Sequence, residues 1–256
     1  MPLMNRVVHP KFREMEPAIA QCIADFDTRG EPLGEAVRNS IKIFGVDGMR
    51  INIKSFKKPG AVNSLIYRYI RKSKARRSYE YANMLLEKGF GTPQPMAFFE
   101  DSGLFGLGES YYVSEQLAAD LMFRELTINP GYPDREQIIV QYTQFAFELH
   151  EAGIEFIDNT SGNTLIRKEA GGYRFYLVDL NRMNFHGAMP FEKRMENLAK
   201  LTTQPDILQV MAREYARLAG IGEHMVHRTL VRMANAFLES FERRRRIKRR
   251  LKFWKK

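Results

Sequence analysis

Cysteine is almost absent from this chain of 256 residues. Cys22 is the only one, so no intrachain disulfide can form, and we expect it to be a small buried hydrophobe.

The chain also lacks an uninterrupted apolar run of the roughly 20 residues that a transmembrane helix needs, and its first residues, MPLMNRVVHPKFREMEP, lack the apolar core of a secretory signal. We therefore expect the chain to stay in the cytosol. Its 44% hydrophobic and 12% aromatic content suffices for one large domain or two lobes.

Acidic residues are missing from the C-terminal run Arg243 to Lys256. This run holds ten of the 40 Lys and Arg residues, and without it 30 basic residues face 30 acidic ones, so the run accounts for the net charge of +10. Such localisation argues against a nucleic-acid-binding domain, which spreads its basic residues over a folded face. Because Ile247, Leu251 and Trp254 recur there at helical spacing, we expect an interfacial helix that binds an anionic membrane surface through residues 243–256. The alternative is a solvated tail.

Several familiar site motifs are also missing from the sequence. There is neither a Walker-type Gly-Lys-Ser/Thr loop nor a nucleophile elbow. The glycine-rich stretch DSGLFGLGES lies between two strand-like runs, which favours a hairpin loop over a phosphate cradle. Glu223, His224 and His227 have helical spacing for a metal, but no cysteine or third histidine is near them in sequence, so we expect a surface helix.

The stretch from 149 to 184 carries the strongest chemical pattern. Asp158 and Asn163 lie in a polar loop between an apolar helix end and a short strand, and Asp179 follows a second strand, 173–178. Two strands joined by a turn bring their ends together, so the three side chains can converge. Carboxylate and amide oxygens suit Mg²⁺ carrying phosphate, because that ion prefers oxygen ligands. In phosphoryl transfer Asp158 would orient the attacking hydroxyl, while Asn163 and Asp179 hold the metal.

These residues carry a family resemblance. The run His150-x-x-Gly153-Ile154-x-Phe156-x-Asp158, followed by Asn163-x-Leu165 and Val178-Asp179-Leu180, resembles the catalytic loop and metal-binding turn of protein-kinase-like folds. It looks most like the bacterial lipopolysaccharide kinase family, whose members phosphorylate Kdo or heptose sugars of the lipid A core. The resemblance covers about residues 38 to 185. It implies a two-lobed α+β fold, with a small antiparallel-sheet N-lobe and a mostly helical C-lobe, and it implies ATP and Mg²⁺ as cofactors.

The sequence also departs from the kinase pattern. Phe156 replaces the histidine that usually stands two residues before the catalytic Asp, Thr160 stands where protein kinases carry Lys, and Asn181 replaces the glycine after the metal-binding Asp. These changes disfavour a protein kinase more than they disfavour catalysis. His150 lies at a helix end before Gly153, which suits a structural histidine better than a catalytic one.

The resemblance also assigns roles in the N-lobe. Two strands alternate around Asp47-Gly48, a strong hairpin signal, and their alternation puts Ile51 and Ile53 on the core face and Lys54 on the other. By resemblance Lys54 holds the nucleotide phosphates. Glu80, on a helix predicted over 75–88, is then its expected ion-pair partner.

Backbone contacts to the nucleotide are expected at two further places. Gly34 is the only glycine where kinase-like folds place several, so amides of Arg38, Asn39 or Ser40 would contact phosphate instead. The backbone near Glu115 and Leu117, in the connector between lobes, would hydrogen-bond adenine.

The predicted organisation is an N-lobe over 1–117, a helical C-lobe over 118–241 and a basic amphipathic tail over 242–256. Apolar periodicity predicts helices over 137–151, 190–201, 205–218 and from 222 onward. We expect an ATP-dependent kinase of a lipid-linked, lipopolysaccharide-type sugar, peripheral at the inner face of the cytoplasmic membrane. The alternatives are a catalytically weak pseudokinase that acts as a membrane-associated scaffold, and a nucleic-acid-binding protein that uses the basic tail.

Overall fold

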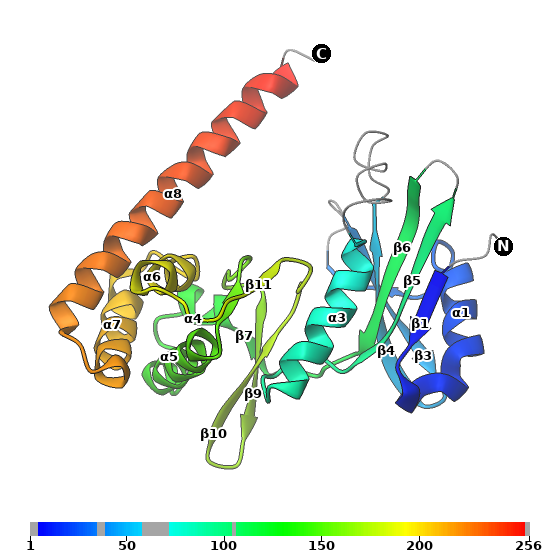
Figure 1. Cartoon of the computed structure of the whole chain (residues 1–256), viewed down its shortest axis with the longest axis horizontal. Helices are drawn as coiled ribbons and strands as arrows, with labels where there is room; N and C mark the ends of the chain where they lie inside the picture. Colours follow the sequence, from blue (N-terminus) through cyan, green and yellow to red (C-terminus); the bar gives the residue numbers. More distant parts are fainter. Residues whose placement is uncertain (1–4, 35–38, 58–71, 104–105, 254–256) are drawn as a thin grey trace. The chain divides into compact units, whose positions relative to one another are not determined.

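The computed structural model describes residues 5–34, 39–57, 72–103 and 106–253 (Figure 1). The chain divides into two compact units. Unit 1 consists of Met1–Ala118 with Leu177–Arg182, and unit 2 of Ala119–Tyr176 with Met183–Lys256. The segment Leu177–Arg182 therefore belongs to the first unit, although the sequence analysis assigned it to the second.

Unit 1 contains a six-stranded antiparallel sheet in the order β1-β5-β6-β4-β3-β2. The strands are β1 (Asn5–Val8), β2 (Glu31–Pro32), β3 (Asn39–Val46), β4 (Met49–Phe56), β5 (Pro95–Gly103) and β6 (Gly106–Glu115). At the β3–β4 turn both Asp47 and Gly48 have positive φ, as a two-residue hairpin of type I′ requires. The glycine-rich stretch joins β5 to β6, with Gly103 paired to Gly106, so both predicted hairpins are confirmed.

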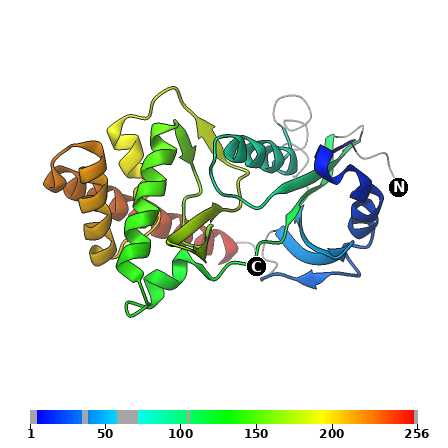
Figure 2. The same ribbon diagram turned by 90° about the horizontal axis from the view of Figure 1, so that it is seen from below.

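Helices cover both faces of this sheet (Figures 1 and 2). On one face the 3₁₀ helix η1 (Pro10–Met15) and α1 (Glu16–Ala24) bury Phe12 and Ile19 in the cluster that holds Ile51 and Ile53. On the other face α3 (Lys74–Glu87) packs its Ala75 with residues of β4 and β5. The predicted alternation along β4 is thus confirmed, and Lys54 lies on the α3 face.

Unit 2 is mostly helical around one apolar core. Its helices are α4 (Phe123–Ile128), α5 (Arg135–Glu151), α6 (Phe191–Ala199), α7 (Pro205–Ala219) and α8 (Glu223–Phe253). Three strands, β7 (Leu121–Met122), β9 (Thr164–Glu169) and β10 (Gly172–Leu177), form one small sheet, and β8 (Ile154–Phe156) pairs with β11 (Met183–Phe185). The predicted stripe on α5 is confirmed: Ile138, Ile139 and Tyr142 are fully buried with residues of α7 and α8.

Helix α8 runs without a break through position 242, where the sequence analysis began a separate tail. Among the residues of α8 whose side chains the structure describes, Ala234 is the last buried hydrophobic one. The C-terminal part of α8 extends beyond the other helices of unit 2 (Figure 1). Leu238, Phe241 and Ile247 are exposed along that part. Within the described ranges, none of the helices combines the length and apolarity needed to cross a bilayer.

Candidate functional site

Lys54 and Asp179, which the sequence analysis assigned to phosphate and metal binding, form an ion pair within unit 1. Lys54 projects from β4 and is only 9% exposed, and its Nζ lies 2.5 Å from Asp179 Oδ1. The ammonium also lies 5.4 Å from the centre of the Phe56 ring. Because the two residues are 125 positions apart, the sheet and the returning segment 177–182 are both needed to form this ion pair.

The turn that carries Asp179 has an unusual backbone. Asp179 has a φ of 62°, in the left-handed region that non-glycine residues enter rarely, although Asp and Asn do so more readily than others. The Asn181 Nδ2 donates to Asp179 Oδ1 at 2.6 Å, so this oxygen accepts from two donors. Asp179 Oδ2 has no partner within the described residues, and the side chain is 35% exposed. One carboxylate oxygen is thus fixed by two donors, while the other has no donor among the described residues.

Three further hydrogen bonds hold the Asp179 turn to unit 1. The Leu177 amide donates to Gly91 O at 2.9 Å, and Thr92 Oγ1 donates to Leu177 O at 2.8 Å. At the other end of the segment, Arg77 of α3 donates to Asn181 O at 2.7 Å. These bonds explain why the segment belongs to unit 1.

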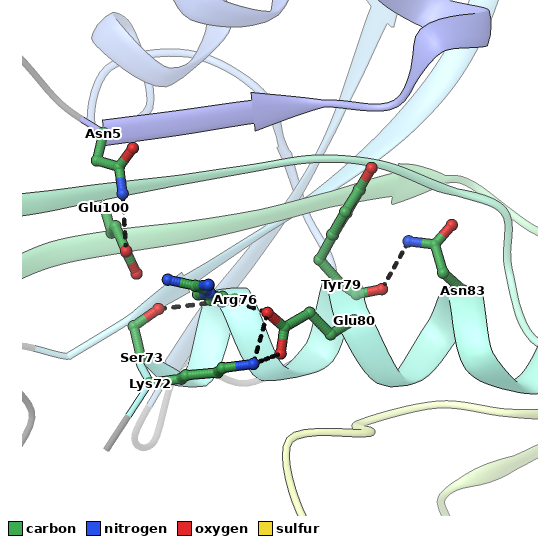
Figure 3. Close-up of polar contacts among 8 residues, drawn as sticks. All are labelled: Asn5, Lys72, Ser73, Arg76, Tyr79, Glu80, Asn83 and Glu100. Carbon is green, nitrogen blue, oxygen red and sulfur yellow. Dashed lines mark hydrogen bonds and ion pairs between the residues drawn. The ribbon is translucent and has the colours of Figure 1, made fainter. Parts of the chain in front are cut away.

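Glu80 does not pair with Lys54 in this structure, and this corrects the sequence prediction. Its carboxylate accepts from Lys72 Nζ at 2.8 and 3.0 Å and from Arg76 Nε at 2.9 Å (Figure 3). Arg76 lies one helical turn from Glu80, a spacing at which ion pairs form readily. Cations close to Glu80 in the sequence therefore bind its carboxylate. Burial raises the pKa of Glu80, but the hydrogen bonds from Lys72 and Arg76 outweigh it and leave this pKa below its ordinary value.

The residues expected to contact phosphate and adenine through the backbone lie at two strand ends. Asn39 and Ser40 begin β3, opposite Phe56 and Ser55 of β4, whereas Arg38 lies outside the described residues. The Glu115 amide donates to Gln94 O at 2.9 Å, so this amide is already engaged within unit 1.

The connector after β6 has one contact that the sequence analysis missed. Asn52 of β4 donates to Gln116 Oε1 at 2.9 Å, and Gln116 Nε2 donates to Leu117 O at 3.2 Å. The Leu117 amide makes no hydrogen bond within the described parts of the chain. Asn52 thus ties the connector to the sheet.

Asp158 and Asn163 are brought together in unit 2. Asn163 Nδ2 donates to the Asp158 carbonyl oxygen at 2.9 Å, and the Asn163 amide donates to Thr160 O at 2.9 Å. Since the amide nitrogen of the Asn163 side chain is bonded to the loop, its Oδ1 is directed away from that bond and can serve as a ligand. Both side chains are partly exposed.

A buried polar network fixes the backbone of this loop. Asn197 of α6 donates through Nδ2 to Phe156 O at 2.7 Å, two residues before Asp158. Tyr142 donates to Asn159 Oδ1 at 2.8 Å, and Asn159 Nδ2 donates to Asn197 O at 3.1 Å. Neither Asn159 nor Asn197 was predicted as part of the site. For Asn197, a polar residue beside the apolar residues Met195 and Leu198 of a predicted helix is a signal for such a role.

His150 belongs to the same network and is structural, as expected. Its ring is 1% exposed, with Nδ1 3.0 Å from Tyr215 Oη and Nε2 3.2 Å from Asn197 Oδ1. Asn197 Oδ1 can only accept a hydrogen bond, so Nε2 of the His150 ring carries the proton and Nδ1 accepts from the Tyr215 hydroxyl. Burial lowers the pKa of His150 to about 4, which keeps the ring neutral.

Gly153 is required by the turn that leads into β8. Its φ is +71°, and a Cβ built there would lie 2.1 Å from the His186 carbonyl oxygen. The His186 amide donates to Gly153 O at 2.7 Å, so the chain passes too close for any side chain.

The comparisons with known proteins bear on this arrangement. No protein-family model and no curated protein matches the sequence. Among solved structures, WaaP in complex with acyl carrier protein is similar, with a TM-score of 0.64 over 94% of this chain and 99% of that chain. The chain has the protein-kinase-like fold. Identity to WaaP is only 18%, so the likeness concerns the fold alone, and the two-lobed α+β architecture expected from the sequence is confirmed.

Proposed function

We propose that this protein is a kinase that transfers the γ-phosphoryl group of ATP to a sugar hydroxyl of a lipopolysaccharide-type acceptor. The observation that carries the proposal is the buried Lys54 held by Asp179, a strand lysine beside a carboxylate with one free oxygen. The motif resemblance to lipopolysaccharide kinases supports the acceptor class, and the likeness of fold to WaaP supports a kinase-like fold.

The oxygen ligands present fit Mg²⁺. Asp179 Oδ2 and Asn163 Oδ1 would hold the ion, because Mg²⁺ favours one or two protein oxygens together with phosphate oxygens and water. When bound, Mg²⁺ neutralises charge on the transferred phosphoryl group. Groups of three or more His, Cys, Asp or Glu that could form another kind of metal site are absent from the described residues.

The remaining roles fall to protein side chains. Lys54 binds the nucleotide phosphates through its ammonium, which Asp179 already orients. Asp158, in the loop fixed by the buried network, orients the acceptor hydroxyl and takes its proton as the phosphoryl group arrives. The structure gives Glu80 no contact with Lys54, so the proposal assigns it no direct part.

One observation favours the second candidate function, a pseudokinase that binds nucleotide and acts as a scaffold. Glu80 is engaged by Lys72 and Arg76, so Lys54 lacks the helix carboxylate that kinase-like folds supply. A protein of this kind would bind nucleotide without turning it over.

Two variants separate these functions. Asp158→Asn should bind nucleotide as the unmodified protein does, while turnover falls by about 10²–10⁴-fold because the general base is lost. Asp179→Asn should lose Mg²⁺-dependent nucleotide binding, because an amide is a poorer ligand than a carboxylate for a hard dication. ATP turnover with lipid A precursors, with the product identified by mass, is the measurement. Nucleotide binding without turnover by the unmodified protein would select the pseudokinase.

We also propose that the end of α8 brings the protein to an anionic membrane surface at the inner face of the cytoplasmic membrane, where a lipid-linked acceptor would be found. Arg243 to Arg246 are all exposed, and Ile247 beside them is 51% exposed. Each cation near an anionic surface contributes about 1 kcal/mol, and exposed apolar side chains add to this.

Sedimentation with anionic and neutral vesicles across a salt series tests the membrane proposal. Deleting residues 243–256 should abolish binding to anionic vesicles and leave ATP binding unchanged. Equal vesicle binding by the truncated and full chains would place the anchor elsewhere.

A further inference from the structure

A continuous set of contacts links α3 to the candidate metal ligand Asp179. Arg77, on α3 and 7% exposed, donates to the Asn181 carbonyl oxygen at 2.7 Å. Asn181, 8% exposed, donates in turn from Nδ2 to Asp179 Oδ1 at 2.6 Å. Lys54 donates to the same oxygen at 2.5 Å. All four residues belong to unit 1.

We propose that Arg77 and Asn181 are positioning residues for Asp179, so that α3 acts on the metal site through Arg77 rather than through Glu80. This inference rests on the proposed function, because it assigns a purpose to the orientation of Asp179. It also gives a role to Asn181, which stands where the kinase pattern has glycine after the metal-binding Asp.

The backbone of Asp179 explains why such support is needed. A left-handed φ is unfavourable for a non-glycine residue and persists only where the surroundings enforce it. Arg77 holds the peptide two residues later, and Asn181 holds the carboxylate itself. Asn181 and Lys54 both donate to Oδ1, which directs Oδ2 away from these protein donors toward a cation. Removing the Asn181 side chain lets the carboxylate rotate, and removing Arg77 releases the backbone of the turn that carries it.

The position of Arg77 on α3 favours this role over a purely packing one. Alanine or methionine would fill the same helix face without burying a guanidinium, which is costly unless it makes hydrogen bonds. Its neighbour Arg76 points elsewhere: its Nε donates to Glu80, whose other partner is Lys72 (Figure 3). Adjacent arginines on one helix therefore supply a variant and its matched control.

The test measures Mg²⁺-dependent nucleotide binding by the full chain, using a fluorescent ATP analogue titrated with and without Mg²⁺. The variants are Arg77→Met, Arg77→Lys and Asn181→Gly, with Arg76→Met as the control. Residues that orient a metal ligand typically change metal affinity by 10–100-fold, so Arg77→Met and Asn181→Gly should raise the half-saturating Mg²⁺ concentration by about tenfold. Arg77→Lys, which keeps a donor, should recover part of the loss, and Arg76→Met should match the unmodified protein.

A second readout separates positioning from general destabilisation. Nucleotide affinity without Mg²⁺ should stay within about twofold in each variant, since Lys54 and the connector are untouched. Equal losses of nucleotide affinity with and without Mg²⁺ would overturn the inference. An Asn181→Gly variant with the same half-saturating Mg²⁺ concentration as the unmodified protein would also overturn it. If Arg77→Met does not fold, the result for Asn181→Gly decides the question.

The proposed function can fail in a distinguishable way. If the unmodified protein shows no Mg²⁺-dependent nucleotide binding, the kinase proposal falls and this inference falls with it. If the unmodified protein does show such binding and the variants equal it, this inference alone is wrong.

Discussion

Replacing Asn197 with leucine tests whether the buried network holds the loop of Asp158. Asn197 is 3% exposed, and its side chain bonds to Phe156 O at 2.7 Å and to His150 Nε2 at 3.2 Å. Leucine has nearly the same size, so the change removes hydrogen bonds without opening a large cavity. The third bond, from Asn159 to the Asn197 carbonyl oxygen, uses the backbone and survives.

The expected cost follows from what is left without a partner. The Phe156 carbonyl and the His150 N–H both stay buried, and an unsatisfied buried group costs about 1–3 kcal/mol. Asn197→Leu should therefore lower the free energy of unfolding by about 2–6 kcal/mol, a large part of the roughly 5–15 kcal/mol typical of a folded domain. Turnover should fall further than nucleotide affinity, because Phe156 lies two residues before Asp158.

A double-mutant cycle with His150→Leu isolates the His150–Asn197 contact. Removing both partners leaves neither of them unsatisfied, so the double variant should cost less than the sum of the single changes, by about 0.5–3 kcal/mol. Urea unfolding at neutral pH and ATP turnover are the assays. A change in unfolding free energy below about 0.5 kcal/mol in Asn197→Leu would refute the reasoning, as would additive costs in the cycle.

Two further predictions concern the same unit. Gly153→Ala should destabilise the protein by about 3 kcal/mol, from left-handed strain and the loss of the hydrogen bond to His186. Gly220→Ala is the control: at a φ of +65° with nothing within 4 Å, it should cost only the strain of about 1 kcal/mol. Equal thermal shifts in the two variants would contradict this. His150 has its pKa lowered from 6.5 to about 4, so the unfolded chain takes up a proton below pH 6.5 that the folded chain takes up only near pH 4. Stability should fall by up to about 3 kcal/mol as the pH drops through this window, and His150→Gln should flatten the dependence in urea midpoints measured from pH 7 to 4. Burial raises the pKa of Glu155, but hydrogen bonds from neighbouring side chains lower it to about 2, so Glu155 adds acid sensitivity only below pH 4.5.

Local sequence determined the elements and their order. The hairpin at Asp47-Gly48 and the stripe on α5 depend on residues that are neighbours in the chain, so turn chemistry and periodicity predicted both. The same holds for the loop from Asp158 to Asn163, whose internal hydrogen bonds span only a few positions. The α+β class followed from these local features and from the motif resemblance.

Only the tertiary structure decided which residues each polar side chain pairs with. Glu80 had Lys54 as its expected partner but pairs with Lys72 and Arg76 instead, because these cations lie only eight and four positions away in the sequence and compete successfully with a distant one. Arg77 and Asn181 are 104 positions apart, and nothing local indicates that they meet. Such pairings arise when strands and helices pack and each buried donor must find an acceptor within reach, and that choice depends on the whole of a unit rather than on any stretch of its sequence.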